Sequence, residues 1–262
     1  MHDAAYRALG LPHTYERLET QPDELPERVE ALRRGIFAGL NVTVPHKERV
    51  MGLVDALDDT ARIIGAANTL VRTPRGVQAC NTDGPALVEE LSSLRGGVSF
   101  AGRSAIVIGS GGAARSAVFA LAQLGVACIF VRARSERREL EAICAGVPTR
   151  LAMRFEPLSA LPRPVDDACA IVQTTTAGMV GSSAPGSLAV EAVAWAALPS
   201  DCVVYDVVYA PEQTPLVEHA AAHGLRSASG LGMLVRQGGL AFERWLGIAP
   251  PLEVMRAALK KS

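Results

Sequence analysis

The sequence has few aromatic residues and no marked excess of positive or negative charge. Only 5% of the 262 residues are Phe, Trp or Tyr, so a platform of stacked nucleic-acid bases is not expected. The formal net charge of -1 offers no basic surplus for nucleic acid and no acidic block typical of a disordered tail. No signal peptide and no apolar run near 18 residues is recognisable, so we expect no membrane association and a cytoplasmic protein.

Cysteine is present but shows no pairing pattern. The five cysteines form no C-x-x-C pair, and no histidine stands at ligand spacing from any of them: Cys80, Cys128, Cys144, Cys169 and Cys202. Three of them lie in apolar runs. We therefore expect small buried side chains in a reducing compartment and no metal site.

The chain divides into three zones. Residues 1–97 alternate short helices and strands, with a hairpin predicted around the turn at 73–76. Residues 98–230 alternate apolar strands with helices, which predicts βαβ units and a parallel sheet. Strands are expected at Ser104–Gly109, Ala127–Val131, Cys169–Val172 and Cys202–Val207. Residues 231–262 are predicted to be helical. The fold class is therefore α/β.

A glycine loop follows the first of these strands. Gly109-Ser-Gly-Gly-Ala-Ala-Arg115 stands between a predicted strand and a predicted helix, with Ala114 in place of the usual third glycine. Glycines there allow a sharp turn and close approach of a pyrophosphate, which the helix N-terminus would bind. The alternative is a tight strand-to-helix turn without a ligand. The placement favours dinucleotide binding.

Two arginines follow the second strand, at the position that selects the cofactor. An acidic residue there binds the ribose 2′-hydroxyl of NAD, whereas arginine suits the 2′-phosphate of NADP. Arg132 and Arg134 occur here, and no acid precedes Glu136. The sequence thus favours NADP over NAD, with Arg132 as the expected ligand. A solvated helix start is the alternative interpretation of both arginines.

Five further motifs carry a resemblance to shikimate dehydrogenases that covers nearly the whole chain. Their order and spacing together are specific, although each alone is modest: Asn41–Lys47 (NVTVPHK), Ile64–Thr69 (IGAANT), Asn81–Gly84 (NTDG), Tyr205–Tyr209 (YDVVY) ahead of Thr214-Pro215, and Gly230–Gln237 (GLGMLVRQ). The resemblance implies a smaller α/β substrate domain with a mixed sheet at 1–97 and a Rossmann-like NADP-binding domain at 98–230. It also implies that the C-terminal helices at 231–262 return to the substrate domain and that the active site lies in the cleft between the domains.

The resemblance also implies roles for individual residues. Lys47 and Asp83 become the catalytic pair. The residues around a polyhydroxylated ring would be Asn41, Thr43, Asn68, Thr82, Tyr209 and Gln237. The residues at the cofactor would be Gly109, Gly111, Gly112, Ala113 and Arg132 at its phosphates, Thr175 nearby, and Gly232 and Met233 beside the nicotinamide.

These residue types suit the implied chemistry. A lysine can donate or accept the proton at a substrate oxygen while a carboxylate orients it. Taken singly, Lys47 could be a surface lysine at a helix start and Asp83 an N-cap. The joint pattern favours catalysis.

Three departures from the family pattern stand out. The family's first strand and its S-x-S-P loop, which binds the substrate carboxylate, have no counterpart ahead of Met1. Either the start lies upstream, which we favour, or the chain is a truncated paralogue, and a chain starting at Met1 is expected to bind shikimate weakly. Val131 stands where an asparagine is usual, and Gln173-Thr-Thr-Thr176 replaces an asparagine-led stretch.

The expected function is the NADP-dependent interconversion of 3-dehydroshikimate and shikimate, a step of aromatic amino acid biosynthesis. The alternatives are a dehydrogenase of quinate or a related hydroxylated ring acid that uses NAD or NADP, and a noncatalytic NADP-binding paralogue. The expected partners are a small-molecule substrate and a second copy at most, as a monomer or homodimer, with no nucleic acid.

Overall fold

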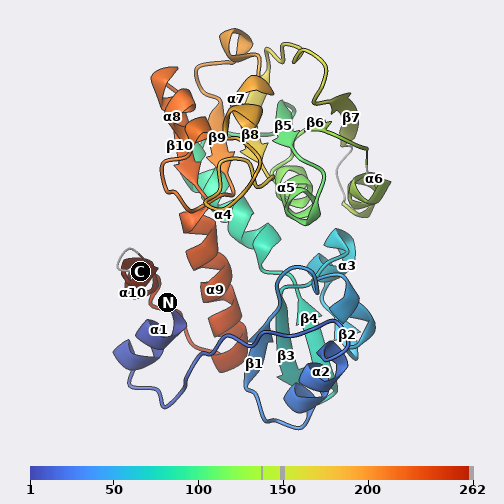
Figure 1. The fold of residues 1–262 in the computed structure, drawn as a ribbon, viewed down its shortest axis with the longest axis vertical. Coiled ribbons are helices and arrows are strands. Elements are labelled where there is room, and N and C mark those ends of the chain that lie inside the picture. Colours follow the sequence, from blue (N-terminus) through green and yellow to red (C-terminus); the bar gives the residue numbers. More distant parts are fainter. Residues whose placement is uncertain (137, 148–150, 260–262) are drawn as a thin grey trace. The chain divides into compact units, whose positions relative to one another are not determined.

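The computed structural model describes residues 1–136, 138–147 and 151–259. It contains two compact units, Met1–Ala86 with Leu234–Ser262 (unit 1) and Leu87–Met233 (unit 2). The chain passes from one unit to the other within two helices, α4 (Asp83–Arg95) and α9 (Leu231–Leu246), both labelled in Figure 1. Residues 260–262, the end of the predicted C-terminal segment, lie outside the described part.

Unit 1 is built on a mixed four-stranded sheet in the order β1-β3-β4-β2 (Figure 1). Strand β3 is antiparallel to both β1 and β4, and β2 is parallel to β4. The predicted hairpin is confirmed, with a turn at Pro74 and Arg75 joining β3 to β4. The elements of unit 1 are α1 (His2–Ala8), α2 (Leu25–Arg33), β1 (Gly39–Asn41), η1 (Arg49–Gly52), β2 (Ala56–Leu57), α3 (Asp59–Ile64), β3 (Thr69–Thr73), β4 (Gly76–Cys80) and α10 (Leu252–Leu259), with parts of α4 and α9.

Two apolar clusters hold unit 1 together. Leu32 of α2, Ala61 of α3 and Leu70 of β3 belong to one cluster, in which the buried faces of the helices cover the sheet. Tyr6 of α1, Phe242 of α9 and Met255 of α10 belong to the other. Because burying such side chains stabilises folding by about 1.5–3 kcal/mol each, these clusters fix the frame in which the polar residues below are held.

Unit 2 is built on a parallel six-stranded sheet in the order β10-β9-β8-β5-β6-β7 (Figure 1). Counted from β5, this is the 3-2-1-4-5-6 order of a dinucleotide-binding fold. The order reverses between β5 and β8, and ligands of such sheets bind beyond the carboxyl ends of the strands at that point. Its elements are β5 (Ser104–Ile108), α5 (Gly112–Gln123), β6 (Cys128–Ala133), α6 (Arg138–Gly146), β7 (Ala152–Pro157), β8 (Ala168–Gln173), α7 (Ser187–Glu191), η2 (Trp195–Ala197), β9 (Val203–Asp206), α8 (Pro215–Ala222) and β10 (Arg226–Ser229).

The central strands of this sheet are fully buried. Every residue of β5, β8 and β9 is buried, as expected for strands covered by helices on both faces. Among the described residues, no helix is both long and apolar enough to span a bilayer.

Candidate functional site

The predicted substrate residues of unit 1 gather at one edge of its sheet. Asn41 ends β1 and pairs in register with Thr69, the first residue of β3, which in turn pairs with Cys80 at the end of β4. Because β1 and β4 are both antiparallel to β3, their carboxyl ends lie at the same edge. The segments that leave these strands carry Lys47 and Asp83 there.

Lys47 and Asp83 form a short ion pair. Lys47 Nζ donates to Asp83 Oδ2 at 2.7 Å, although 36 positions separate the residues in the sequence. The side chains are 28% and 14% exposed, so the ammonium is only partly covered. An ammonium has three donor hydrogens, and the contact to Asp83 uses one of them. The lysine can therefore serve a second oxygen while the carboxylate orients it.

Asn68 connects the ion pair to the rest of the cluster. Its Nδ2 donates to Asp83 Oδ1 at 2.9 Å and to Thr82 Oγ1 at 2.9 Å. Its Oδ1 accepts from the Thr82 backbone N–H at 2.8 Å. Asn68 is 3% exposed, and Thr82 is completely buried. Because buried amides are costly unless satisfied, this network holds the Asp83 carboxylate in one orientation.

Two more predicted residues reach the same cluster. Asn68 Nδ2 lies 3.4 Å from Gln237 Oε1, a contact at the limit of a hydrogen bond. Asn41 Nδ2 donates to the Asn68 carbonyl at 3.2 Å. Thr43 lies on the loop after β1 and is exposed.

Tyr15 is a member of this cluster that the sequence did not predict. Its hydroxyl donates to Asn41 Oδ1 at 2.9 Å. The tyrosine stands in a stretch without regular structure, and its ring stacks on His2 at 4.3 Å between centroids. No motif or periodicity marks it, so only the tertiary contact reveals it.

In unit 2 the glycine loop has the geometry of a phosphate cradle. Gly109 has φ +110°, which favours glycine, and a Cβ there would lie 2.6 Å from Thr174 Oγ1 and 2.8 Å from Thr175 Cγ2. A Cβ on Gly111 or Gly112 would meet nothing within 4 Å. Gly111 caps α5 without a side-chain hydrogen bond, so the first N–H groups of the helix have no side-chain acceptor from the cap. Ala113 lies in this first turn. The loop therefore fits a pyrophosphate.

The turn after β8 lies beside this loop. Thr174 N–H and Oγ1 both donate to the Ile108 carbonyl, each at 2.8 Å. Gln173 is completely buried, and its amide caps the turn through the Thr175 N–H and the Ala177 carbonyl, the latter at 3.2 Å. The glutamine thus holds the turn that carries Thr175.

The structure does not support the predicted contact of Arg132 with the cofactor phosphate. Arg132 is 2% exposed, and its guanidinium donates to Glu156 at 2.8 Å, to the Ala192 carbonyl at 2.7 Å and to the Arg163 carbonyl at 2.6 Å. The reason is that β6 extends to Ala133, so Arg132 belongs to the buried strand. Arg134 is the first residue beyond the strand and is exposed.

The remaining predicted residues also belong to unit 2. Tyr209 is 50% exposed in the loop after β9. This loop is anchored by Asp206, whose carboxylate accepts from Thr214 Oγ1 at 2.7 Å and from the Val208 N–H at 3.0 Å. Burial raises the pKa of Asp206 from 3.8 to about 6, against the lowering effect of these two hydrogen bonds. Gly232 and Met233 form the first turn of α9.

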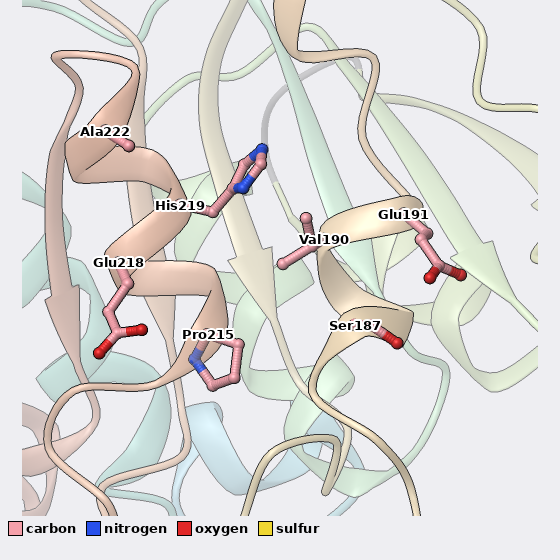
Figure 2. A pocket seen from close by; sticks show the side chains of 7 residues that line it. All are labelled: Ser187, Val190, Glu191, Pro215, Glu218, His219 and Ala222. Carbon is pink, nitrogen blue, oxygen red and sulfur yellow. The ribbon is translucent and has the colours of Figure 1, made fainter.

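A separate open groove lies between α7 and α8, where His219, Val190 and Glu191 project from the two helices (Figure 2). Among the described residues that line it, none belongs to the predicted site.

The parallel sheet of unit 2 has the 3-2-1-4-5-6 strand order, and an open glycine loop follows β5, where that order reverses. These two features define an α/β protein of the dinucleotide-binding class. Comparisons with known proteins give the family. The model of the shikimate dehydrogenase substrate binding domain matches residues 1–70, and that of the shikimate 5'-dehydrogenase C-terminal domain matches residues 230–260. The chain belongs to the shikimate dehydrogenase family.

Full-length relatives agree with these matches. The chain is 37% identical to shikimate dehydrogenase (NADP(+)) of Symbiobacterium thermophilum, over 98% of this chain and 87% of that protein. It is 38% identical to the enzyme of the same name from Geobacter metallireducens, over 100% of this chain and 92% of that protein.

Solved structures are similar in fold as well. Shikimate 5-dehydrogenase from Thermus thermophilus, in complex with NADP(H) and shikimate, has a TM-score of 0.78 and 32% identity, over 99% of this chain and 92% of that one. Quinate dehydrogenase from Corynebacterium glutamicum, in complex with NAD, has a TM-score of 0.86 and 26% identity, over 100% of this chain and 93% of that one.

Proposed function

We propose that this protein is an NADP-dependent shikimate dehydrogenase that interconverts 3-dehydroshikimate and shikimate in aromatic amino acid biosynthesis. The observation that carries the proposal is the Lys47–Asp83 ion pair of 2.7 Å, held by Asn68 inside a cluster of hydroxyl and amide groups. Such groups suit a ring with several hydroxyls, since each can donate and accept hydrogen bonds. The names of the relatives support the same substrate and cofactor.

In the proposed mechanism, Lys47 exchanges a proton with the substrate oxygen. In the direction of reduction, the ammonium gives a proton to the carbonyl oxygen as that oxygen gains charge. Asp83 holds the ammonium in place and stabilises its charge, and Asn68 prevents the carboxylate from turning away. Substrate hydroxyls would be bound by Asn41, Thr43, Thr82, Tyr209 and Gln237.

The cofactor would be held by unit 2. Gly109, Gly111, Gly112 and Ala113 fit its pyrophosphate, because the two middle glycines leave open space beside the start of α5. Thr175, Gly232 and Met233 would lie toward the nicotinamide. When bound, NADPH supplies the hydride.

We assign the 2′-phosphate contact to Arg134 instead of Arg132. Arg134 is exposed directly after β6. Ser110 Oγ of the glycine loop donates to the Ser135 carbonyl at 2.9 Å, so the segment that follows β6 is tied to the loop. A guanidinium there can form a charge-assisted contact to a phosphate.

Quinate or a related ring acid with NAD is the second candidate, because the quinate dehydrogenase named above matches this fold over the whole chain. A noncatalytic NADP-binding protein is the third. A steady-state assay that combines shikimate or quinate with NADP or NAD distinguishes the three. We expect the highest kcat/KM with shikimate and NADP. A preference for quinate would support the second candidate, and NADP binding without turnover on either acid would support the third.

We further propose a cytoplasmic location and a monomer or homodimer. The five cysteines are unpaired, which is usual in a reducing compartment. Light scattering of the purified protein would measure the oligomeric state.

A further inference from the structure

Two glycines lie at the start of α9, Gly230 directly before the helix and Gly232 in its first turn, and each has a different steric requirement. A Cβ on Gly230 would overlap the carbonyl oxygen of Val207, so a side chain there would collide with backbone. A Cβ on Gly232 would overlap the carboxylate of Glu90, a residue of α4. The Glu90 carboxylate therefore lies directly against the start of α9, where the dipole of the helix favours negative charge.

A buried tyrosine links the same carboxylate to the backbone of this turn. Tyr205 of β9 is completely buried. Its hydroxyl accepts from the Met233 N–H at 3.1 Å and lies 3.5 Å from Glu90 Oε2, to which it donates. A carboxylate can only accept and a phenol can do both, so the order is Met233 N–H to Tyr205 to Glu90. Glu90 thus contacts the turn directly at Gly232 and indirectly at Met233.

We propose that Glu90 is a positioning residue that fixes the first turn of α9, acting on Gly232 by contact and on Met233 through Tyr205. The inference rests on the proposed function, in which Gly232 and Met233 lie beside the nicotinamide. Groups beside a reacting ring must be held within a fraction of an ångström of the productive geometry. Loss of Glu90 is therefore expected to loosen this turn and to slow hydride transfer. The glycine loop, which would bind the pyrophosphate, is separate from the turn.

The test is a double-mutant cycle of Gly232→Ala and Glu90→Ala, with two measurements. The first is amide hydrogen exchange of Met233 in the protein without cofactor, which needs no enzyme activity. We expect roughly tenfold faster exchange in Glu90→Ala, in Tyr205→Phe and in Gly232→Ala, since each removes or displaces a support of the turn. We expect the Gly232→Ala substitution to change exchange less when Glu90 is already Ala, because the overlap is gone.

The second measurement is kcat per site, with sites counted by NADPH fluorescence titration. We expect a roughly tenfold lower kcat per site in Glu90→Ala, with the dissociation constant of NADPH nearly unchanged. Partial unfolding would lower the number of sites instead. Glu90→Gln keeps the shape of the side chain and should fold where Glu90→Ala does not, with an intermediate effect on exchange. Glu89→Ala, at the exposed neighbour on α4, is the matched control and should leave exchange and turnover unchanged.

The inference and the proposed function fail in different ways. Parental exchange at Met233 in both Glu90 variants, or strictly additive effects in the cycle, would overturn the role of Glu90 even in an active enzyme. A parent that binds NADPH but turns over no hydroxylated ring acid would overturn the proposed function, while the exchange data would still report on Glu90.

Discussion

We predict that Arg132 and Arg134 have separate roles, Arg132 in the stability of the protein and Arg134 in the choice between NADP and NAD. Arg132→Ala should destabilise the protein and leave the preference for NADP over NAD unchanged. Arg134→Ala should leave the stability nearly unchanged and reduce the preference for NADP over NAD. The reason is that the Arg132 guanidinium is buried with three acceptors, whereas Arg134 is exposed beside the glycine loop.

The expected magnitudes follow from these contacts. Removing Arg132 leaves Glu156, whose side chain is 14% exposed, and two carbonyl oxygens without their partner. Breaking a buried ion pair in this way costs about 3–5 kcal/mol. The lower value corresponds to a fall in Tm of roughly 6–12 °C for a protein of this size. Loss of a charged contact at Arg134 should weaken NADP by roughly ten- to a hundredfold and change Tm little.

Thermal unfolding and fluorescence titration with NADPH and NADH would measure the two effects. Arg75→Ala, in the exposed turn between β3 and β4, removes the same charge far along the chain and is the control. The reasoning is refuted if Arg132→Ala keeps the parental Tm and selectively weakens NADPH, or if Arg134→Ala weakens both cofactors equally.

Three further predictions concern other parts of the molecule. Lys47→Ala should lower kcat by a factor on the order of 10²–10⁴ with near-normal NADPH binding, and equal turnover in mutant and parent would remove Lys47 from the mechanism. Gly109→Ala should lower Tm, because the φ of +110° at Gly109 and the nearby Thr174 both oppose a side chain. Gly112→Ala should keep Tm and weaken NADPH binding in the same fluorescence titration, because the space beside Gly112 is open. A lower Tm with unchanged NADPH binding in Gly112→Ala would contradict a phosphate site at this loop. The Asp206 carboxyl has a folded-state pKa raised from 3.8 to about 6, so the folded protein holds its proton more tightly. The free energy of unfolding should therefore fall by roughly 3 kcal/mol in total as pH rises from well below 3.8 to well above 6. Asp206→Asn lacks this titration, so the Tm of the variant minus the Tm of the parent should be larger at pH 7.5 than at pH 5. A Tm difference that does not change with pH would contradict the raised pKa of Asp206.

The sequence predicted the central strands of unit 2 and missed its edges. Strands β5, β6, β8 and β9 contain apolar runs that a buried parallel sheet requires. Strands β7 and β10 lie at the two ends of the strand order. Strand β7 alternates exposed with half-buried residues and β10 is largely polar, so neither strand contains an apolar run. Edge strands gain their structure from pairing with a neighbour, and that pairing is not visible in local composition.

The end of the second strand lies two residues beyond the predicted position, and this difference changes which arginine is exposed. The sequence placed the end of the second strand at Val131, which made Arg132 the first residue beyond it. In the structure β6 continues to Ala133, so Arg132 is a buried strand residue and Arg134 takes the exposed position. Element boundaries are the least certain part of any sequence-based assignment. A residue role that depends on one therefore needs the structure.

The glycines of the loop after β5 and of the start of α9 have two distinct causes that the sequence alone cannot separate. At Gly109, Gly230 and Gly232, a side chain would collide with neighbouring atoms of the same unit. At Gly111 and Gly112, the space beside the backbone is open, so internal packing does not demand a glycine there. Between a strand and a helix, a glycine that no internal contact requires leaves room for a group outside the chain to approach the backbone. Of these two groups, the loop between β5 and α5 is the one that points to a ligand. At the start of α9, Gly230 is required by the Val207 carbonyl and Gly232 by the Glu90 carboxylate, so both glycines reflect how closely that turn is held.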